Sequence, residues 1–189
     1  MILGLSGKKG SGKDTVADYL CERYDFVKYG FGDPIKEVAR MMFNFSESQL
    51  YGSDKETVDP NWGISPREFF QKFGTDYGQF IFPEHFPNLF QDIQPREFWV
   101  KRFWVWYLEE LEKNPQIKVV ISDVRFIHEF NFIKKNNGYV IKIKRDLMDE
   151  DRHLSENELD NMEDSDFNGI INNNGSLEDL YRKVKNIIN

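Results

Sequence analysis

The sequence predicts an α/β domain in which helices flank a mostly parallel sheet, with a helical insertion in the middle of the chain. Short apolar runs alternate with segments of helical periodicity over most of the 189 residues. The runs at 2–5 and 119–121 are continuously apolar, as in parallel strands that are covered on both faces. Residues 45–97 break this alternation, because they are rich in aromatic residues, glycine and proline. The expected fold is therefore a layered core of sheet and helices with one elaboration.

The N-terminal part of the chain has the pattern strand, turn, helix, strand, helix. The strand at 2–5 runs into a glycine-rich turn, and a helix follows from Lys13 because apolar residues then recur at helical spacing. Aromatic and β-branched residues predict a second strand at 26–31. The next helix spans about 34–44, and its first residue is a proline, which suits that position.

Two helix signals stand out in the middle of the chain. Ser65 and Glu68 form a capping box around a proline in the first helical position. A longer helix from about Arg96 to Glu112 has apolar residues around most of its circumference, so we expect it to be largely buried.

The C-terminal part returns to the alternating pattern. A helix at about 126–136 follows the strand at 119–121, and a strand at 139–144 and a last one at 169–171 come next. Ser176 caps a closing helix. We therefore expect one domain, and its predicted parts are a core at about 1–44 and 113–189, an insertion at about 45–112 and a lid at about 145–166.

Composition excludes several classes of function. The formal net charge of −7 argues against binding of long nucleic acid, which usually needs a basic surface. The only cysteine, Cys21, has no partner for an internal disulfide, which favours a reducing compartment. No apolar stretch approaches about 20 residues, so we expect no membrane-spanning segment. The expectation is a cytoplasmic protein with small-molecule partners.

A glycine-rich turn with the pattern G-x-x-x-x-G-K lies between the first strand and the first helix. Glycines let successive backbone N–H groups point at phosphate oxygens, and the helix N-terminus adds partial positive charge. Lys13 would reach the β- and γ-phosphates of a nucleotide. The pattern predicts a P-loop in a three-layer P-loop NTPase fold, with the ATP-binding residues Gly7, Lys8, Gly10, Ser11, Gly12, Lys13, Asp14 and Thr15.

Asp14 stands where a P-loop usually has the serine or threonine that binds Mg²⁺. A carboxylate is a good hard-oxygen ligand, so we expect Asp14 to contact Mg²⁺ directly or through water. Asp123 ends the strand at 119–121 and is expected at the carboxyl edge of the sheet, as a second metal-site residue. The alternative for Asp123 is the N-cap of the next helix.

Five stretches, taken together, resemble the deoxynucleoside monophosphate kinases of tailed bacteriophages, within the adenylate-kinase-like P-loop kinases. They are residues 6–15, 32–37, 66–67, 74–76 and 123–126. The resemblance covers nearly the whole chain. It implies that ATP, with Mg²⁺ as cofactor, phosphorylates deoxynucleoside 5′-monophosphates to diphosphates in the cytoplasm, which is the host's if a phage encodes the chain. Dimers are common in the family, so a homodimer is compatible with the resemblance.

The C-terminal stretch 171–177 resembles the I-x-N-x-G-S-L ending shared with other small-molecule kinases, including dephospho-coenzyme A kinases. It implies donor-side contacts from Asn172, Gly175 and Ser176.

Two departures concern the acceptor pocket. Gln79 follows the G-T-D-Y-G run, where family members often have arginine, and the stretch 82–95 looks like an insertion.

The acceptor is expected to bind mainly on the insertion. Arg67 would grip the acceptor phosphate with a bidentate fork, the alternative being an ordinary surface arginine. Trp99 would stack on the base, the alternative being core packing. Lys36 would contact phosphate or base, the alternative being a solvated helix start. The predicted acceptor residues are Asp33, Lys36, Arg67, Gln71, Gly74, Thr75, Asp76, Trp99 and Glu129, with 74–76 expected as a turn.

Catalysis is assigned to Lys13, Asp123, Arg125 and Arg152. Arg125 is expected in the first turn of a helix, where the helix dipole disfavours a cation, so an anionic partner is needed. The resemblance makes that partner a phosphate, and the alternative is a salt bridge to Glu129. No general base is needed, because a nucleotide phosphate is largely dianionic near neutral pH.

The predicted lid contributes two arginines. Arg145 is assigned to ATP binding and Arg152 to closure over the transferred phosphate, the alternative being a solvated acidic surface segment.

Two other functions stay open for the whole chain. One is a P-loop kinase for another small acceptor, such as dephospho-coenzyme A, and the other is a nucleotide-binding regulatory protein without an acceptor.

Overall fold

The computed structural model divides into two compact units. The core unit contains residues 1–30 and 106–189, and the helical unit contains residues 31–105. The predicted boundaries of the insertion, 45–112, stay a prediction. The structure describes residues 1–146, 158–159 and 162–188.

The core unit is built on a five-stranded sheet with the order β2-β3-β1-β4-β5, and the paired strands are all parallel. The central strand β1 pairs Leu3 with Val120 on one side and with Tyr139 on the other. Because the strands are parallel, their carboxyl ends share one edge, and the loops that follow them meet there. The strands are β1 (Ile2–Ser6), β2 (Phe26–Tyr29), β3 (Lys118–Ile121), β4 (Tyr139–Lys144) and β5 (Gly169–Asn172).

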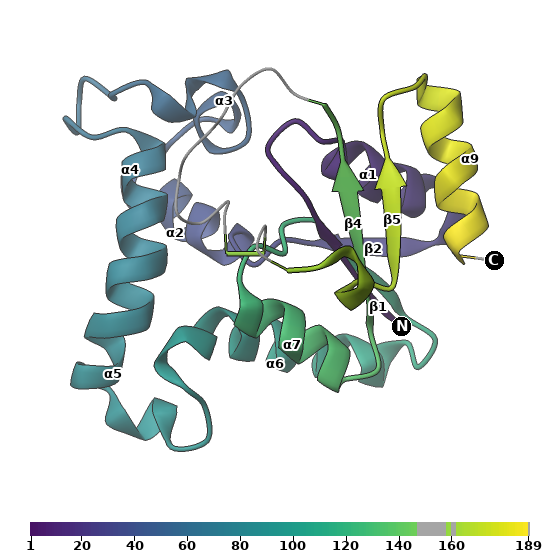
Figure 1. The fold of residues 1–189 in the computed structure, drawn as a ribbon. Helices are drawn as coiled ribbons and strands as arrows, with labels where there is room; N and C mark the ends of the chain where they lie inside the picture. Colours follow the sequence, from purple (N-terminus) through teal and green to yellow (C-terminus); the bar gives the residue numbers. More distant parts are fainter. Residues whose placement is uncertain (147–157, 160–161, 189) are drawn as a thin grey trace. The chain divides into compact units, whose positions relative to one another are not determined.

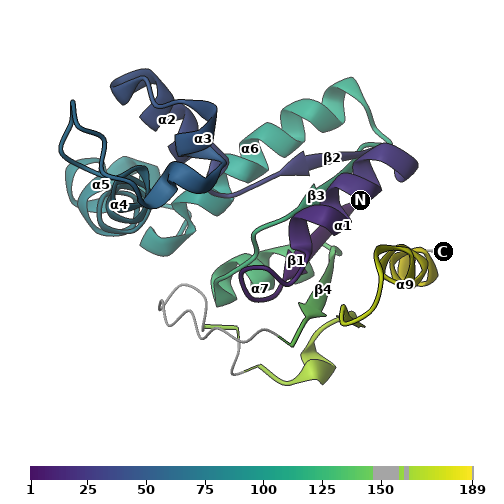
Figure 2. The ribbon, with the colours of Figure 1, turned by 90° about the horizontal axis from the view of Figure 1, so that it is seen from above.

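Helices cover both faces of this sheet. Figure 2 shows α1 (Lys13–Tyr24) and α9 (Leu177–Ile188) on one face and α7 (Ile127–Lys135) on the other. Apolar side chains of α1 and α9, such as Leu20 and Leu180, are buried against the sheet. Burying a leucine side chain contributes about 1.5–3 kcal/mol, so this interior is the main source of stability of the unit. The predicted α/β fold with a parallel sheet between helices is confirmed.

The helical unit contains more helix than the sequence pattern indicated. Short helices are marginal by themselves and depend on packing, which here includes an aromatic cluster around Phe43, Phe45 and Phe69. The sixth α-helix, α6, begins in this unit and continues into the core unit. The elements are α2 (Asp33–Phe43), α3 (Glu47–Leu50), η1 (Ser53–Glu56), α4 (Pro66–Gln71), η2 (Lys72–Ile81), α5 (Phe82–His85), η3 (Pro87–Phe90), η4 (Pro95–Glu97) and α6 (Phe98–Lys113).

Helices α4, η2 and α5 follow one another without a break and form one rod (Figure 1). Its middle part, η2, is a π-helix, so the turn predicted at 74–76 is wrong. Two glycines explain why the rod continues. A Cβ on Gly74 would lie 2.7 Å from Ile35 Cδ1, and one on Gly78 would lie 2.8 Å from Trp99 Nε1. The missing side chains therefore admit neighbours from α2 and α6, and this packing offsets the low helix propensity of glycine.

Within the described ranges, no helix combines the length and the apolar composition that crossing a bilayer requires.

Candidate functional site

The loop between β1 and α1 owes its shape to three glycines. Gly7, Gly10 and Gly12 have φ values of 146°, 78° and 105°, which favour glycine over other residues. A Cβ on Gly7 would also lie 2.2 Å from the carbonyl oxygen of Ile143, on the neighbouring strand. The glycines at both ends of the predicted P-loop are thus required by geometry as well as by pattern.

Lys13, the first residue of α1, lies over this loop. Its Nζ donates to the carbonyl oxygens of Gly7 and Lys8, the latter at 2.9 Å. The ammonium group and the N-terminus of α1 therefore bring positive charge to the same loop. This is the arrangement that binds an anion such as a polyphosphate.

Ser11 lies inside the loop with its hydroxyl buried. Only 1% of the residue is exposed, and Oγ has no hydrogen-bond partner within the described part of the chain. Buried hydroxyl groups are normally hydrogen-bonded, so this atom suits a ligand that carries acceptor oxygens. The carbonyl oxygen of Ser11 is held by Asn173, whose Nδ2 donates to it at 2.8 Å.

Asn173 is a contact that our sequence reasoning missed. We assigned the donor-side asparagine to Asn172, but the asparagine of the I-x-N-x-G-S-L pattern is Asn173, and its amide braces the P-loop from the loop after β5. Counting from the isoleucine of that pattern, Ile171, would have identified Asn173 as its asparagine, although not its bond to Ser11.

The other predicted donor-side residues lie in the loops after β4 and β5. Arg145 Nη1 donates to the carbonyl oxygen of Gly10 at 3.4 Å, a long hydrogen bond that brings this arginine to the P-loop. Ser176 caps α9, because its Oγ accepts from the backbone N–H of Asp179. Gly175 is close-packed, since a Cβ there would lie 2.7 Å from Asp179 Oδ2. The loops that follow β4 and β5 therefore meet the P-loop at the edge where the strands end.

Asp14 forms an ion pair that the sequence did not indicate. Lys28 Nζ, on β2, lies 3.0 Å from Asp14 Oδ1 and 2.9 Å from Asp18 Oδ1. Burial alone would lower the pKa of Lys28, but the hydrogen bonds to Asp18 and Asp14 outweigh it and raise the pKa. A lysine in the middle of a predicted strand was the one sequence signal of this contact. Asp14 therefore lies in the first turn of α1, where its carboxylate is paired with Lys28.

The loop between β3 and α7 carries Asp123 and Arg125. We predicted Arg125 in the first turn of a helix, but α7 begins at Ile127 and Phe126 is its N-cap, with extended backbone. The reasoning from the helix dipole is therefore wrong for Arg125. The alternative that made Asp123 the N-cap is wrong for the same reason.

Glu129 explains where α7 begins. Its Oε2 accepts hydrogen bonds from the backbone N–H groups of Arg125, at 2.7 Å, and Phe126, at 3.0 Å. Glu158 adds a third carboxylate contact, since its Oε2 accepts from the N–H of Ile127 at 3.0 Å. These bonds satisfy N–H groups that the helix leaves without partners. Glu129 thus shapes the loop that presents Asp123 and Arg125, and its predicted contact with the acceptor stays a prediction.

The carboxyl group of Glu129 is buried, with 4% of the residue exposed. Burial, and then the charge of Asp123, raise its pKa from the ordinary value of 4.5 to about 8, although the two N–H bonds and Arg125 act in the opposite direction. Folded Glu129 therefore holds a proton at pH values at which it is ionised in the unfolded chain.

This shift predicts that stability depends on pH. Between pH 4.5 and about 8, folding takes up a proton at Glu129, so the free energy of unfolding should fall as the pH rises through this range. Glu129→Gln keeps an oxygen for the two N–H bonds and removes the titration, so it should flatten the fall. Urea unfolding of the unaltered protein and of Glu129→Gln from pH 5 to pH 8 measures how steeply the free energy of unfolding falls in each. Equal slopes for the two proteins would contradict the assignment.

In the helical unit, Arg67 and Lys36 are held by acidic neighbours. Arg67, in the first turn of α4 as predicted, has its Nε 3.0 Å from Glu56 Oε1. Lys36 Nζ lies 2.7 Å from Asp33 Oδ1 and 4.4 Å from the ring centre of Tyr51. The predicted acceptor residues Asp33 and Lys36 are thus a direct pair at the start of α2.

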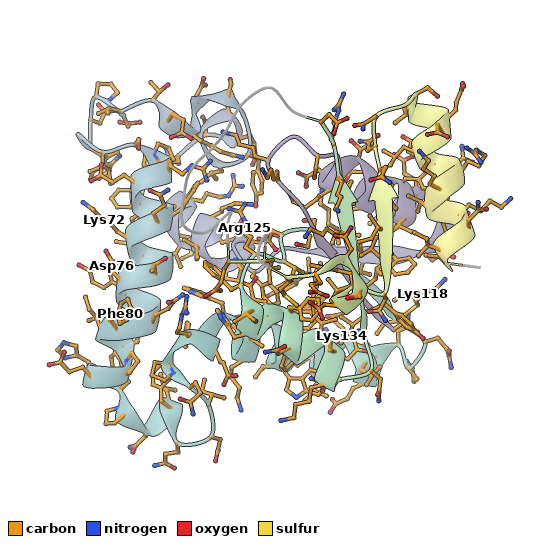
Figure 3. The ribbon with its side chains drawn as sticks, in the orientation of Figure 1. Lys72, Asp76, Phe80, Lys118, Arg125 and Lys134 are labelled. Carbon is orange, nitrogen blue, oxygen red and sulfur yellow. The ribbon has the colours of Figure 1, made fainter. Side chains whose placement is uncertain are left out.

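The remaining acceptor residues predicted in this unit lie on the rod or against it. Gln71 ends α4, and Gly74, Thr75 and Asp76 lie in η2. Figure 3 shows Asp76 on the same side of the rod as Lys72 and Phe80. Trp99 packs against the rod, and its Nε1 donates to the carbonyl oxygen of Gly74 at 2.8 Å.

Arg152, the predicted catalytic arginine of the lid, lies outside the described residues, as do residues 147–157 as a whole.

The described residues contain no group of three or more histidine, cysteine, aspartate or glutamate side chains that could hold a metal ion. The predicted metal residues are the two carboxylates Asp14 and Asp123. That number suits Mg²⁺, which proteins commonly hold through one or two carboxylates together with substrate phosphates and water.

Comparison with known proteins gives consistent matches. The family model described as "Deoxynucleotide monophosphate kinase" matches residues 1–59 and 54–184. The "Putative deoxynucleotide monophosphate kinase" of Acanthamoeba polyphaga mimivirus is 39% identical over 188 residues, which cover 97% of this chain and 94% of the relative. The "Deoxynucleotide monophosphate kinase" proteins of Escherichia phage RB69 and Enterobacteria phage T4 are each 25% identical over 99% of this chain, with 99% and 98% of the relatives covered.

Proposed function

Since the chain belongs to the deoxynucleotide monophosphate kinase family and is a deoxynucleotide monophosphate kinase, we propose that ATP donates its γ-phosphate to the 5′-phosphate of a deoxynucleoside monophosphate. An oxygen of the acceptor phosphate bonds to the γ-phosphorus, and the bond from that phosphorus to the β–γ bridging oxygen breaks. The products are a deoxynucleoside diphosphate and ADP. Family membership favours this acceptor over dephospho-coenzyme A and over a regulatory protein without an acceptor.

The P-loop is the observation that carries the donor half of the proposal. Three glycines with positive φ, the N-terminus of α1 and the Lys13 ammonium surround one loop. Phosphate oxygens of ATP would supply the hydrogen-bond partner that Ser11 Oγ needs. Lys13 would neutralise charge that develops on the β- and γ-phosphates during transfer.

We propose that Mg²⁺ binds here through Asp14 and Asp123, because one or two carboxylates beside phosphate oxygens suit this ion. When bound, the ion would neutralise phosphate charge and orient the transferred group. Asp14 would have to give up its ion pair with Lys28, which then keeps Asp18 as a partner. We propose that Arg125 contributes positive charge to the same reaction. We propose the same role for Arg152, for which the sequence pattern is the only support.

On the acceptor side, we assign the phosphate to Arg67. Glu56 engages Nε of this arginine, and the two terminal nitrogens form the planar fork that binds a phosphate through two parallel hydrogen bonds. Because Glu56 holds the Nε of Arg67, it orients the two terminal nitrogens that are proposed to bind the phosphate. A homodimer and a cytoplasmic location stay predictions.

A panel of acceptors tests the proposed function. ADP production from ATP should depend on an added deoxynucleoside monophosphate, and the diphosphate should appear in equal amount. The panel includes the four deoxynucleotides, the ribose counterparts, dephospho-coenzyme A and a sample without acceptor. ADP production that ignores every nucleotide, or that responds to dephospho-coenzyme A alone, would reject the proposal.

Removing the acceptor fork should weaken acceptor binding selectively. Arg67→Ala is expected to raise KM for the acceptor by about 10- to 100-fold, since a hydrogen bond to a charged group contributes about 1.5–3 kcal/mol, and to leave KM for ATP within about twofold. Steady-state kinetics with each substrate varied in turn measures both constants. Arg102→Ala, which removes an exposed arginine of α6 in the same unit, is the matched control. Equal changes of both KM values would contradict the assignment of Arg67.

A further inference from the structure

The chain segments that leave β4 and β5 stay joined beyond the sheet. The two strands run side by side and pair as far as Lys144 and Asn172 (Figure 1). One residue further, the backbone N–H of Asn173 donates to the carbonyl oxygen of Lys144 at 2.7 Å. The next contact is made by a side chain, that of Asn174, which reaches Asp146. The two loops therefore begin as one paired segment.

Asn174 and Asp146 form two hydrogen bonds with each other. Asn174 Oδ1 accepts from the backbone N–H of Asp146 at 2.9 Å, and Asn174 Nδ2 donates to Asp146 Oδ2 at 2.7 Å. An asparagine can do both, because its amide carries an acceptor oxygen beside a donor nitrogen. The bond to the carboxylate is charge-assisted and is therefore stronger than a bond between neutral groups. Asn174 thus holds both the backbone and the side chain of Asp146.

Arg145 lies between the two residues that are tied to the loop after β5. Lys144 is held through its carbonyl oxygen by Asn173, and Asp146 is held by Asn174. The main chain is thus restrained on both sides of Arg145, which limits the directions that its side chain can take. Its Nη1 donates to the carbonyl oxygen of Gly10 at 3.4 Å. Since a bond of this length is weak, the restraint on the backbone does most to keep the guanidinium beside the P-loop.

The same stretch of the loop after β5 also holds the P-loop. Asn173 Nδ2 donates to the carbonyl oxygen of Ser11 at 2.8 Å. A Cβ on Gly12 would lie 2.5 Å from this nitrogen, so the two loops are in close contact. Two successive asparagine side chains therefore hold the P-loop and the residue that follows Arg145. Their contacts fix where the guanidinium of Arg145 lies relative to the P-loop.

We propose that Asn174 is a positioning residue for the phosphate donor, because by holding Asp146 it keeps the guanidinium of Arg145 at the P-loop, where it binds ATP. The inference rests on the proposed function, in which the P-loop binds ATP, and deepens it. A guanidinium offers only donors and a permanent positive charge, which suits a polyanionic ligand. Asn174 acts through Arg145.

Calorimetric titration with ATP tests the inference without any acceptor. Asn174→Ala should raise Kd for ATP by about fivefold or more, because both hydrogen bonds to Asp146 are lost and Arg145 is no longer held in place. In steady-state kinetics, KM for ATP should rise as well, while KM for the deoxynucleotide stays within about twofold. Asn186→Ala, which removes an exposed asparagine of α9 in the same unit, is the matched control and should leave both constants unchanged.

A double-mutant cycle shows whether Asn174 acts through Arg145. Arg145→Ala alone should raise Kd for ATP by about 10-fold or more. In the Arg145→Ala protein, Asn174→Ala should add less than about twofold, because no guanidinium remains to be positioned. If Asn174→Ala raises Kd by the same factor with and without Arg145, the two residues act independently and the inference is overturned.

Exchange of the two side chains tests the hydrogen bonds themselves. Asn174→Asp sets one carboxylate against another and should raise Kd for ATP at least as much as Asn174→Ala. Asp146→Asn alone keeps an acceptor oxygen for Asn174 and should leave Kd within about twofold. The two substitutions together restore a donor opposite an acceptor and should return Kd to within about twofold of the unaltered protein. Effects that simply add up in the double variant would show that net charge, and not the pair of bonds, decides the affinity.

Two further results would overturn the inference while leaving the proposed function in place. One is an Asn174→Ala protein with unchanged Kd for ATP. The other is an equal rise of KM for both substrates. Thermal unfolding shows whether the variants are folded, and Asp146→Ala, which removes the charge-assisted bond, replaces Asn174→Ala if that variant does not fold. Failure of transfer to every deoxynucleotide, together with the expected changes of Kd, would reject the proposed acceptor and support the role of Asn174 at the donor loop.

Discussion

Lys13→Ala is expected to lower kcat for phosphate transfer by about 10²- to 10³-fold, the cost of losing one preorganised donor at a developing negative charge. Lys13 begins α1, and its ammonium lies over the glycine loop within reach of two carbonyl oxygens of that loop. The side chain thus brings its charge to the loop where ATP phosphates are proposed to bind. Alanine removes both the charge and the length of the lysine side chain, so the substitution tests the two together.

The fold should survive this substitution, because the Nζ of Lys13 interacts at the edge of the loop and the core unit is stabilised by apolar burial elsewhere. Lys9→Ala removes the same charge from an exposed position of the same loop and should keep most of the activity. Single-turnover transfer and thermal unfolding measure the two effects separately. A Lys13→Ala protein that keeps more than a few per cent of kcat would remove the P-loop from the mechanism.

Gly7→Ala should have the largest effect on stability. The new Cβ would lie 2.2 Å from the carbonyl oxygen of Ile143 and 2.8 Å from Ser11 Oγ, and the backbone there has φ of 146°. The first of these neighbours is backbone of β4 in the central sheet, so relief of the clash requires movement of the loop or of the strand. We expect a loss of about 3 kcal/mol or more, together with loss of transfer activity.

Gly63→Ala is a control for a positive φ at a position where the new side chain has no close neighbour. Gly63 also has a positive φ, 69°, but a Cβ there would meet nothing within 4 Å. This substitution should cost only about 1 kcal/mol, the ordinary penalty for a left-handed residue with a side chain. The two free energies of unfolding, measured in urea, are compared directly. If Gly7→Ala costs no more than Gly63→Ala, the close contact with β4 does not constrain the loop.

Much of the core unit was predictable from local pattern. The apolar run at 2–5, the glycine turn and the helix from Lys13 correspond to β1, the P-loop and α1, and the alternation at 139–144 corresponds to β4. Such elements are recognisable because strand burial and helix periodicity are repeated over several residues of one segment. Ser65 was recognisable as the N-cap of α4 for the same reason, since its Oγ accepts from the N–H of Glu68 three residues on, while the Glu68 carboxylate pairs with Lys72.

The errors occurred where distant residues decide local structure. Gly74 indicated a turn by its own propensity, but Ile35 and Trp99 pack against the two glycines of that segment and keep it helical. The start of α7 was also misplaced, since Glu158, 31 residues further along the chain, accepts from the N–H of Ile127, in addition to the local bonds from Arg125 and Phe126 to Glu129.

The sequence by itself therefore determined the type of core, the phosphate-binding loop and the family, because these depend on residue types at fixed short spacings. Only the tertiary structure showed that Asn173 braces the loop, that Lys28 holds Asp14 and that Asn174 pairs with Asp146. Each of these contacts joins segments that are separated along the chain, and no periodicity records which of them meet. The phosphate-binding loop could be found from the sequence, whereas the contacts that hold and orient its neighbours required the folded chain.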